Sequence, residues 1–156
     1  MHIVAIIQSR WDSTRFLGKA LADLYGKPML QRIVDEARRA KGNQVIVATT
    51  LSSPPIIDYC RKNGIGISVL WLRDASGEPL SEYVLASRVS KADLVVRIWG
   101  DCPLIEKDHI NHCIEECLAG KWDYYWDFAE KGKGVAVITP KLLKRLDKEL
   151  FLRKDR

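Results

Sequence analysis

Short runs of β-branched and apolar residues alternate along the chain with segments whose apolar residues recur at helical spacing. Four such runs predict strands, at residues 2–7, 44–50, 66–72 and 93–99. Their nearly continuous Val and Ile content indicates burial on both faces, which is typical of a parallel sheet.

Helical segments separate these runs. Pro28 suits a first helical turn, apolar residues follow at spacings of three and four from Leu30 to Ala37, and basic residues fill the last turn. Further helices are predicted at 55–63, 80–91, 107–118 and 140–152, and later strands at 122–128 and 135–139. The alternation predicts an α/β fold of three layers, a doubly wound, mainly parallel sheet, in a single domain spanning residues 1–156.

This order of elements predicts where a ligand binds. In open parallel sheets, ligands bind beyond the carboxyl ends of the strands, where the winding direction reverses. With strand order 3-2-1-4, the loops after the first and fourth strands meet at that crevice. These loops, 8–19 and 100–103, are also the two most polar strand exits in the chain.

The loop after the first strand has the composition of an anion-binding loop. Arginine and lysine donate to phosphate oxygens, hydroxyls add donors, and a glycine lets the backbone approach a ligand. The candidates are Ser9, Arg10, Ser13, Thr14, Arg15, Gly18 and Lys19. The loop is not a Walker A sequence, because Ala20 follows Gly18-Lys19 and no glycine stands five residues before Gly18. A solvated surface loop is the competing interpretation.

Asp101 places a carboxylate just past the fourth strand, between Gly100 and Pro103. It either pairs with Arg15 or Lys19, or holds a hard cation such as Mg²⁺ between itself and substrate phosphates.

Three segments together resemble the signature of the cytidylyltransferase family, which activates acidic sugars such as acylneuraminates and 3-deoxy-manno-octulosonate. They are residues 6–10, 13–19 with 26–30, and 96–105, the last most similar to the branch named for spore-coat polysaccharide biosynthesis. The resemblance covers about His2 to Leu143 and implies a nucleotide-diphospho-sugar transferase-like fold.

The resemblance also implies a reaction. A sugar oxygen attacks the α-phosphorus of CTP, with Mg²⁺ as cofactor, and a CMP-sugar and pyrophosphate form. By position, Arg15, Lys19 and Asp101 are the catalytic candidates, with Asp101 the metal ligand. The nucleotide-binding candidates are Gln8, Ser9, Arg10, Ser13, Thr14, Arg15, Gly18, Lys19, Arg97 and Gly100. Gln8 is expected to face the base or ribose.

Three departures from the family pattern qualify this expectation. Leu17 stands where the family usually has proline, and residues 134–137 lack the acidic pair that relatives tend to carry there. The sequence also ends at Arg156, before the position of a late aspartate that relatives use as a second metal ligand. Asp123 and Asp127 are the substitutes available. We therefore expect nucleotide binding with weak or absent transfer unless a second chain completes the site. The alternatives are a related nucleotidyl or glycosyl transferase, and a non-catalytic nucleotide or nucleotide-sugar binding subunit.

Composition narrows the partners only slightly. The net charge of +5 is spread along the chain and suits an anionic small molecule as well as a nucleic acid. The basic tail is read as a solvated helix face, so no nucleic-acid partner is expected. No apolar run reaches the ~18 residues of a membrane span, and no secretory signal is evident, so a cytoplasmic location and no membrane contact are expected. The four cysteines are too sparse for a disulfide scaffold and are expected to be reduced thiols.

Two further clusters stand out. His109, Cys113 and Cys117 share a helix face with His112 nearby, which permits a zinc site, although an apolar core face is the stronger interpretation. The aromatic run from Trp122 to Trp126 supplies core area or, where exposed, a homodimer contact.

Overall fold

The structure is a computed structural model that describes residues 1–12, 16–70, 79–127 and 132–154. The strands within these ranges are β1 (Ile3–Gln8), β2 (Gln44–Thr50), β3 (Gly66–Leu70), β4 (Leu94–Trp99), β5 (Tyr124–Asp127) and β6 (Val135–Ile138). The helices are a 3-10 turn η1 (Lys19–Leu21), α1 (Met29–Arg39), α2 (Pro54–Lys62), α3 (Pro79–Ser90), α4 (Lys107–Ala119) and α5 (Pro140–Lys154).

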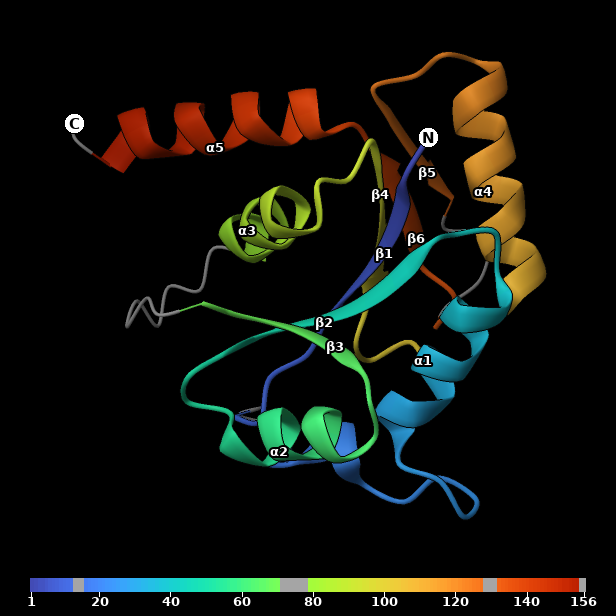
Figure 1. The fold of residues 1–156 in the computed structure, drawn as a ribbon, viewed down its shortest axis with the longest axis vertical. Helices are drawn as coiled ribbons and strands as arrows, with labels where there is room; N and C mark the ends of the chain where they lie inside the picture. The colour runs from blue at the N-terminus through green and yellow to red at the C-terminus, as the bar shows by residue number, and fades with distance from the viewer. Residues whose placement is uncertain (13–15, 71–78, 128–131, 155–156) are drawn as a thin grey trace.

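The strands form one sheet in the order β3-β2-β1-β4-β6-β5. The first four pair in parallel, and β6 and β5 add on as antiparallel strands. The expected 3-2-1-4 order is therefore confirmed. The winding direction reverses between β1 and β4, which lie side by side at the centre of the sheet (Figure 1).

The observed elements match the predicted ones, with ends that differ by one or two residues. The clearest difference is at β5, which begins at Tyr124 rather than at Trp122. The Trp122 amide donates instead to the carbonyl of Cys117, so it belongs to the turn that ends α4. Residues 71, 72 and 128, predicted as strand ends, lie outside the described residues.

Helices cover both faces of the sheet, as the three-layer prediction requires (Figure 1). Side chains of alternate strand positions divide into two buried clusters, one packed against α1, α2 and α4 and the other against α3 and α5. In β1, Ala5 and Ile7 join the first cluster, whereas Val4 and Ile6 join the second. This burial on both faces explains the unbroken apolar run of the central strand.

No helix in the described part of the chain combines the length and apolar character needed to cross a bilayer.

Candidate functional site

The exits of β1 and β4 touch at the point where the sheet reverses direction. Gln8 is the register partner of Trp99, and the next residue, Gly100, donates its amide hydrogen to the Gln8 carbonyl over 2.9 Å. A Cβ atom at Gly100 would stand 2.1 Å from that carbonyl oxygen. Only glycine permits so close an approach, so Gly100 joins the two predicted loops.

A cation and a carboxylate from these loops meet just beyond that junction. Lys19 Nζ lies 3.4 Å from Asp101 Oδ2, and the two side chains are 34% and 50% exposed. The pairing of Asp101 with Lys19 is thus one of the arrangements expected from the sequence. Ser13, Thr14 and Arg15, the other expected donors of the first loop, lie outside the described residues.

A tryptophan supports the turn that delivers Lys19. Gly18 adopts a left-handed backbone conformation with φ of 72° and donates its amide hydrogen to the Trp11 carbonyl. A Cβ at Gly18 would stand 2.7 Å from the Trp11 ring. The Trp11 amide in turn donates to the buried Ser53 hydroxyl, ahead of α2. The turn is therefore fixed to the body of the protein, a role for Trp11 that the sequence pattern did not signal.

Arg10 points to the other face of the sheet, toward α3. Its Nη2 lies 3.2 Å from Glu82 Oε1, and the Glu82 side chain is only 2% exposed. Burial raises the pKa of Glu82, while the charge of Arg10 and hydrogen bonds from Gln8 and Arg10 oppose that rise. Gln8 and Arg10 therefore sit beside a buried acid that sequence reasoning missed, because Glu82 falls within an otherwise ordinary helical segment.

Arg97 lies on this same face. Its guanidinium stacks 4.4 Å from the Trp99 ring centre and 5.0 Å from that of Tyr83. Burial raises the pKa of Tyr83 to about 12. Within the described residues, Glu82 Oε2 and Arg97 Nε are buried without a hydrogen-bond partner. Such atoms are rare in folded proteins and call for an explanation such as a ligand or an ordered water.

Ser9 is placed differently from its neighbours. It is 5% exposed and its amide hydrogen bonds to the Ala48 carbonyl, so it continues the pairing of the sheet. The expected site residues therefore fall into separate groups. Lys19 and Asp101 meet at the loop junction. Gln8, Arg10 and Arg97 lie on the α3 face, and Ser9 is buried beneath the junction.

Asp101 suits a magnesium ion, because Mg²⁺ is held in proteins by one or two carboxylates together with water and substrate phosphates. The two substitute carboxylates do not join it. Asp123 accepts a hydrogen bond from the Thr139 hydroxyl. Both residues lie at the opposite edge of the sheet, where Ile138 pairs with Tyr124 and with Val95 near the amino end of β4. Asp127 lies at the carboxyl edge, but its Oδ2 is 3.8 Å from Nδ1 of His109 on α4.

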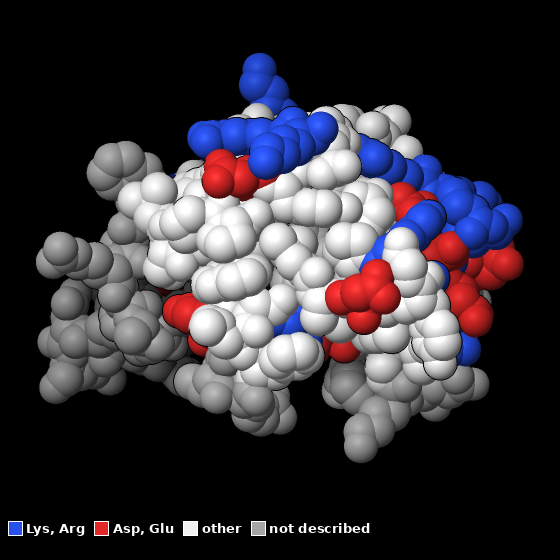
Figure 2. Space-filling model, turned by 90° about the horizontal axis from the view of Figure 1, so that it is seen from below, with Lys and Arg blue, Asp and Glu red and all other residues white. Residues whose placement is uncertain are grey.

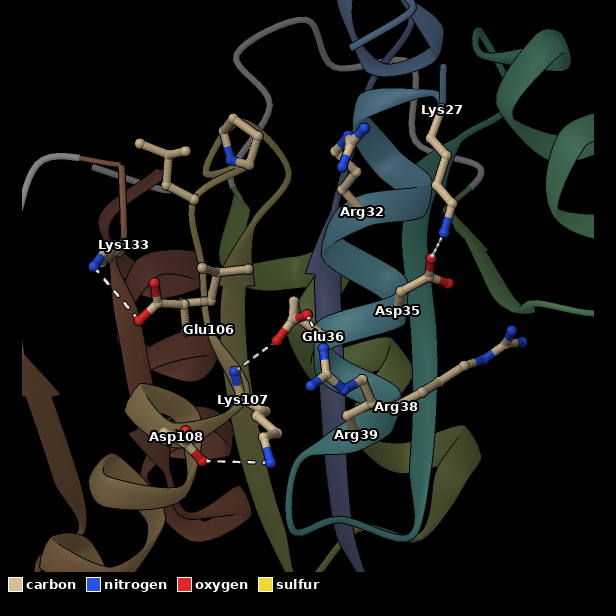
Figure 3. A pocket seen from close by; sticks show the side chains of 13 residues that line it. Lys27, Arg32, Asp35, Glu36, Arg38, Arg39, Glu106, Lys107, Asp108 and Lys133 are labelled. Carbon is tan, nitrogen blue, oxygen red and sulfur yellow. Dashed lines mark hydrogen bonds and ion pairs between the residues drawn. The ribbon is translucent and has the colours of Figure 1, made fainter. Parts of the chain in front are cut away.

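A groove of about 1080 Å³ runs between α1 and the segment that leads from β4 into α4 (Figure 3). Its acids are already matched with cations: Asp35 with Lys27, Glu36 with Arg39, Glu106 with Lys133 and Asp108 with Lys107. Hydrogen bonds from Lys27 and Gln31 lower the pKa of Asp35 despite its partial burial.

The remaining arginines of the groove are also engaged. Arg32 donates to the carbonyls of Leu24 and Tyr25, and Arg38 donates to that of Gly64. These cations hold loops and helix ends in place, so the β1–β4 junction remains the candidate ligand site. In the view of Figure 2, Lys and Arg side chains gather along the top and the right of the face, and uncharged residues cover much of its middle.

Comparison with known proteins identifies the family and the fold. The cytidylyltransferase family profile matches residues 4–153. The 3-deoxy-manno-octulosonate cytidylyltransferase of Neisseria gonorrhoeae (strain NCCP11945) is 38% identical over 115 residues, which cover 73% of this chain and 45% of the relative. The chain thus spans about half the length of the curated relatives it matches.

Two solved structures share the fold. A cytidylyltransferase from Leptospira borgpetersenii superposes with a TM-score of 0.82 at 24% identity, covering 95% of this chain and 64% of the other. A CMP:2-keto-3-deoxy-manno-octonic acid synthetase complexed with CTP gives a TM-score of 0.79 at 19% identity, with coverages of 95% and 78%.

Proposed function

The chain belongs to the cytidylyltransferase family, and from this membership we propose that it transfers the cytidylyl group of CTP to an acidic sugar. The oxygen of a sugar hydroxyl forms a bond to the α-phosphorus and the hydroxyl proton passes to the solvent, while the bond from that phosphorus to the bridging oxygen breaks and pyrophosphate leaves. The relatives named for 3-deoxy-manno-octulosonate support an acidic sugar of that class. The CMP-sugar would then serve as a donor in surface polysaccharide biosynthesis.

The observation that carries this proposal is the meeting of Lys19 and Asp101 over 3.4 Å at the β1–β4 junction. Lysine supplies the positive charge that a triphosphate needs, and aspartate supplies the oxygen ligand that a divalent cation needs. The chemistry requires little more than positioning and charge stabilisation, which a rigid junction provides.

The phosphate-binding role is proposed for the cationic and hydroxyl side chains of the first loop. These are Ser13, Thr14, Arg15 and Lys19, whereas Arg10 lies beside Glu82 on the α3 face and Ser9 is buried beneath the junction. Gly18 and Gly100 allow the backbone to approach the ligand. Gln8 and Arg97 lie on the α3 face, where Glu82 Oε2 and Arg97 Nε are buried and have no hydrogen-bond partner among the described residues, and we assign this face to the base and ribose.

Asp101 would hold the Mg²⁺. The ion would offset the charge that develops on the phosphate oxygens during transfer. Lys19 then holds the leaving phosphates on the same side of the junction.

A homodimer is part of the proposal. Trp122, Tyr124 and Trp126 are 58%, 43% and 51% exposed around the edge strand β5, and exposed aromatic side chains of this kind favour a contact between chains.

Pyrophosphate release tests the reaction directly. The protein is incubated with CTP, Mg²⁺ and either 3-deoxy-manno-octulosonate or an acylneuraminate, with UTP and ATP as nucleotide controls. We expect sugar-dependent and CTP-dependent release that Asp101→Asn reduces at least a hundredfold. Absence of release with every acidic sugar, despite CTP binding, would instead support a nucleotide-binding subunit. The position of Asp123 away from Asp101 is the observation that favours this second candidate.

A further inference from the structure

A second cluster of metal-binding groups lies between α4 and β5, and it shares no residue with the β1–β4 junction. His109 and Cys113 are one helical turn apart on α4, and Asp127 at the end of β5 faces them. One ring nitrogen of His109, the Cys113 Sγ and a carboxylate oxygen of Asp127 all lie within 4.8 Å of one another.

The residues that lie together in the structure differ from the cluster predicted from the sequence, which included His112 and Cys117. His112 is exposed on the outer side of α4. Cys117 directs its Sγ to the carbonyl of Trp122 over 3.4 Å. Asp127 takes their place, because the antiparallel pairing of β5 with β6 brings it to α4.

The separations within the cluster suit an ion at its centre. His109 Nδ1 lies 3.8 Å from Asp127 Oδ2, and His109 Nε2 lies 4.0 Å from Cys113 Sγ. The first distance is longer than a nitrogen–oxygen hydrogen bond. Ligand atoms around a tetrahedral zinc ion stand roughly 3.3 to 3.6 Å apart, given its usual bond lengths. A single ring nitrogen of His109 binds the ion, so only one of these two distances applies to a given arrangement. With one ligand atom from each residue, the three atoms lie within 4.8 Å of one another, and their separations must shorten by up to about 1.5 Å for the site to close.

Charge and burial also match a divalent ion. A thiolate and a carboxylate together neutralise Zn²⁺, so the bound ion leaves no uncompensated charge inside the protein. Cys113 is fully buried, whereas the His109 and Asp127 side chains are 14% and 24% exposed. An ion can therefore arrive from the solvent side, and water can occupy the fourth position.

We propose that His109, Cys113 and Asp127 form a zinc-binding site that fastens the edge strand β5 to α4. On binding, the Cys113 thiol loses its proton to water as the zinc–sulfur bond forms, and no group is oxidised or reduced. The mixed nitrogen, sulfur and oxygen ligand set favours zinc over Mg²⁺ or Ca²⁺, which prefer oxygen ligands alone.

The test uses untagged protein treated with a chelator and then titrated with Zn²⁺ or Co²⁺. We expect a single zinc ion per chain, a raised melting temperature, and a thiolate-to-cobalt charge-transfer absorption. Asp127→Asn should weaken zinc binding at least tenfold, because even the loss of a group that only supports a zinc ligand costs 10- to 100-fold. Cys113→Ser should abolish the charge-transfer band.

His112→Ala and Cys117→Ser are the matched controls on the same helix, and both should bind zinc as the original protein does. Zinc binding that survives Asp127→Asn unchanged, or that Cys117→Ser abolishes, would overturn the assignment, as would the absence of binding. Serine places a hydroxyl in a buried position at either cysteine, so Asp127→Asn on its partly exposed side chain, with His112→Ala as its control, carries the test alone if a serine variant does not fold.

Discussion

Replacing Gly100 with alanine tests whether the contact between the two strand exits organises the site. The new Cβ would stand 2.1 Å from the Gln8 carbonyl oxygen, where protein structures keep such atoms at least 3.0 Å apart. The loop after β4 must then move by about 1 Å, which also stretches the 2.9 Å hydrogen bond from Gly100 to Gln8. Forcing an extra methyl group into a packed position costs about 1–3 kcal/mol.

Two measurements follow from this displacement. Urea unfolding should show Gly100→Ala to be less stable by about 1–3 kcal/mol, and pyrophosphate release from CTP should fall by about 100-fold, since misplacement by 1 Å has that effect on a reaction. Gly42→Ala is the control, because its Cβ would meet only the Ile3 carbonyl at an ordinary 3.6 Å. It should change stability by less than about 0.5 kcal/mol. If Gly100→Ala matches the Gly42→Ala control in both assays, the reasoning about this contact is wrong.

Three further predictions concern charge and thiol chemistry. Lys19→Met should change the free energy of unfolding by less than about 1 kcal/mol, because its ion pair is exposed. It should nevertheless weaken CTP binding, measured by calorimetry, at least tenfold. Lys27→Met in the groove is the control and should leave CTP binding unchanged. Because burial raises the pKa of Glu82 above its ordinary value of 4.5, the folded protein holds that proton more tightly and loses stability as pH rises from 4.5 through the raised value. Urea unfolding across this range should show that Glu82→Gln lacks the decline, and an identical slope would contradict the assignment. Iodoacetamide should label Cys102 before the three cysteines that are 2% exposed or less, as followed by mass spectrometry, and preferential labelling of any of those three would contradict the described packing.

The order of strands and the location of the crevice could be predicted because buried strands have a recognisable pattern of residues in the sequence. Central parallel strands are apolar on both faces, so β1 and β4 stand out as continuous runs, and their polar exits mark the edge where they end. Lys19 and Asp101 could be paired in advance for the same reason.

The residues on the α3 face of the site could not be predicted, because no comparable sequence pattern marks them. Glu82 falls in a helix beside Tyr83, and nothing in the local pattern says that this acid is buried against Arg10. Its position depends on how α3 packs over the sheet, which is a tertiary property. The same holds for Asp127, whose approach to His109 depends on the antiparallel pairing of β5.

A calorimetric titration of CTP, with Mg²⁺ present or chelated, tests the central claim that the exits of β1 and β4 form one nucleotide and metal site. We predict that CTP binds at a single site per chain, that chelation weakens the binding, and that Asp101→Asn binds with the same weakened affinity in either condition. No heat of binding, or a Mg²⁺ dependence unchanged in Asp101→Asn, would contradict the claim.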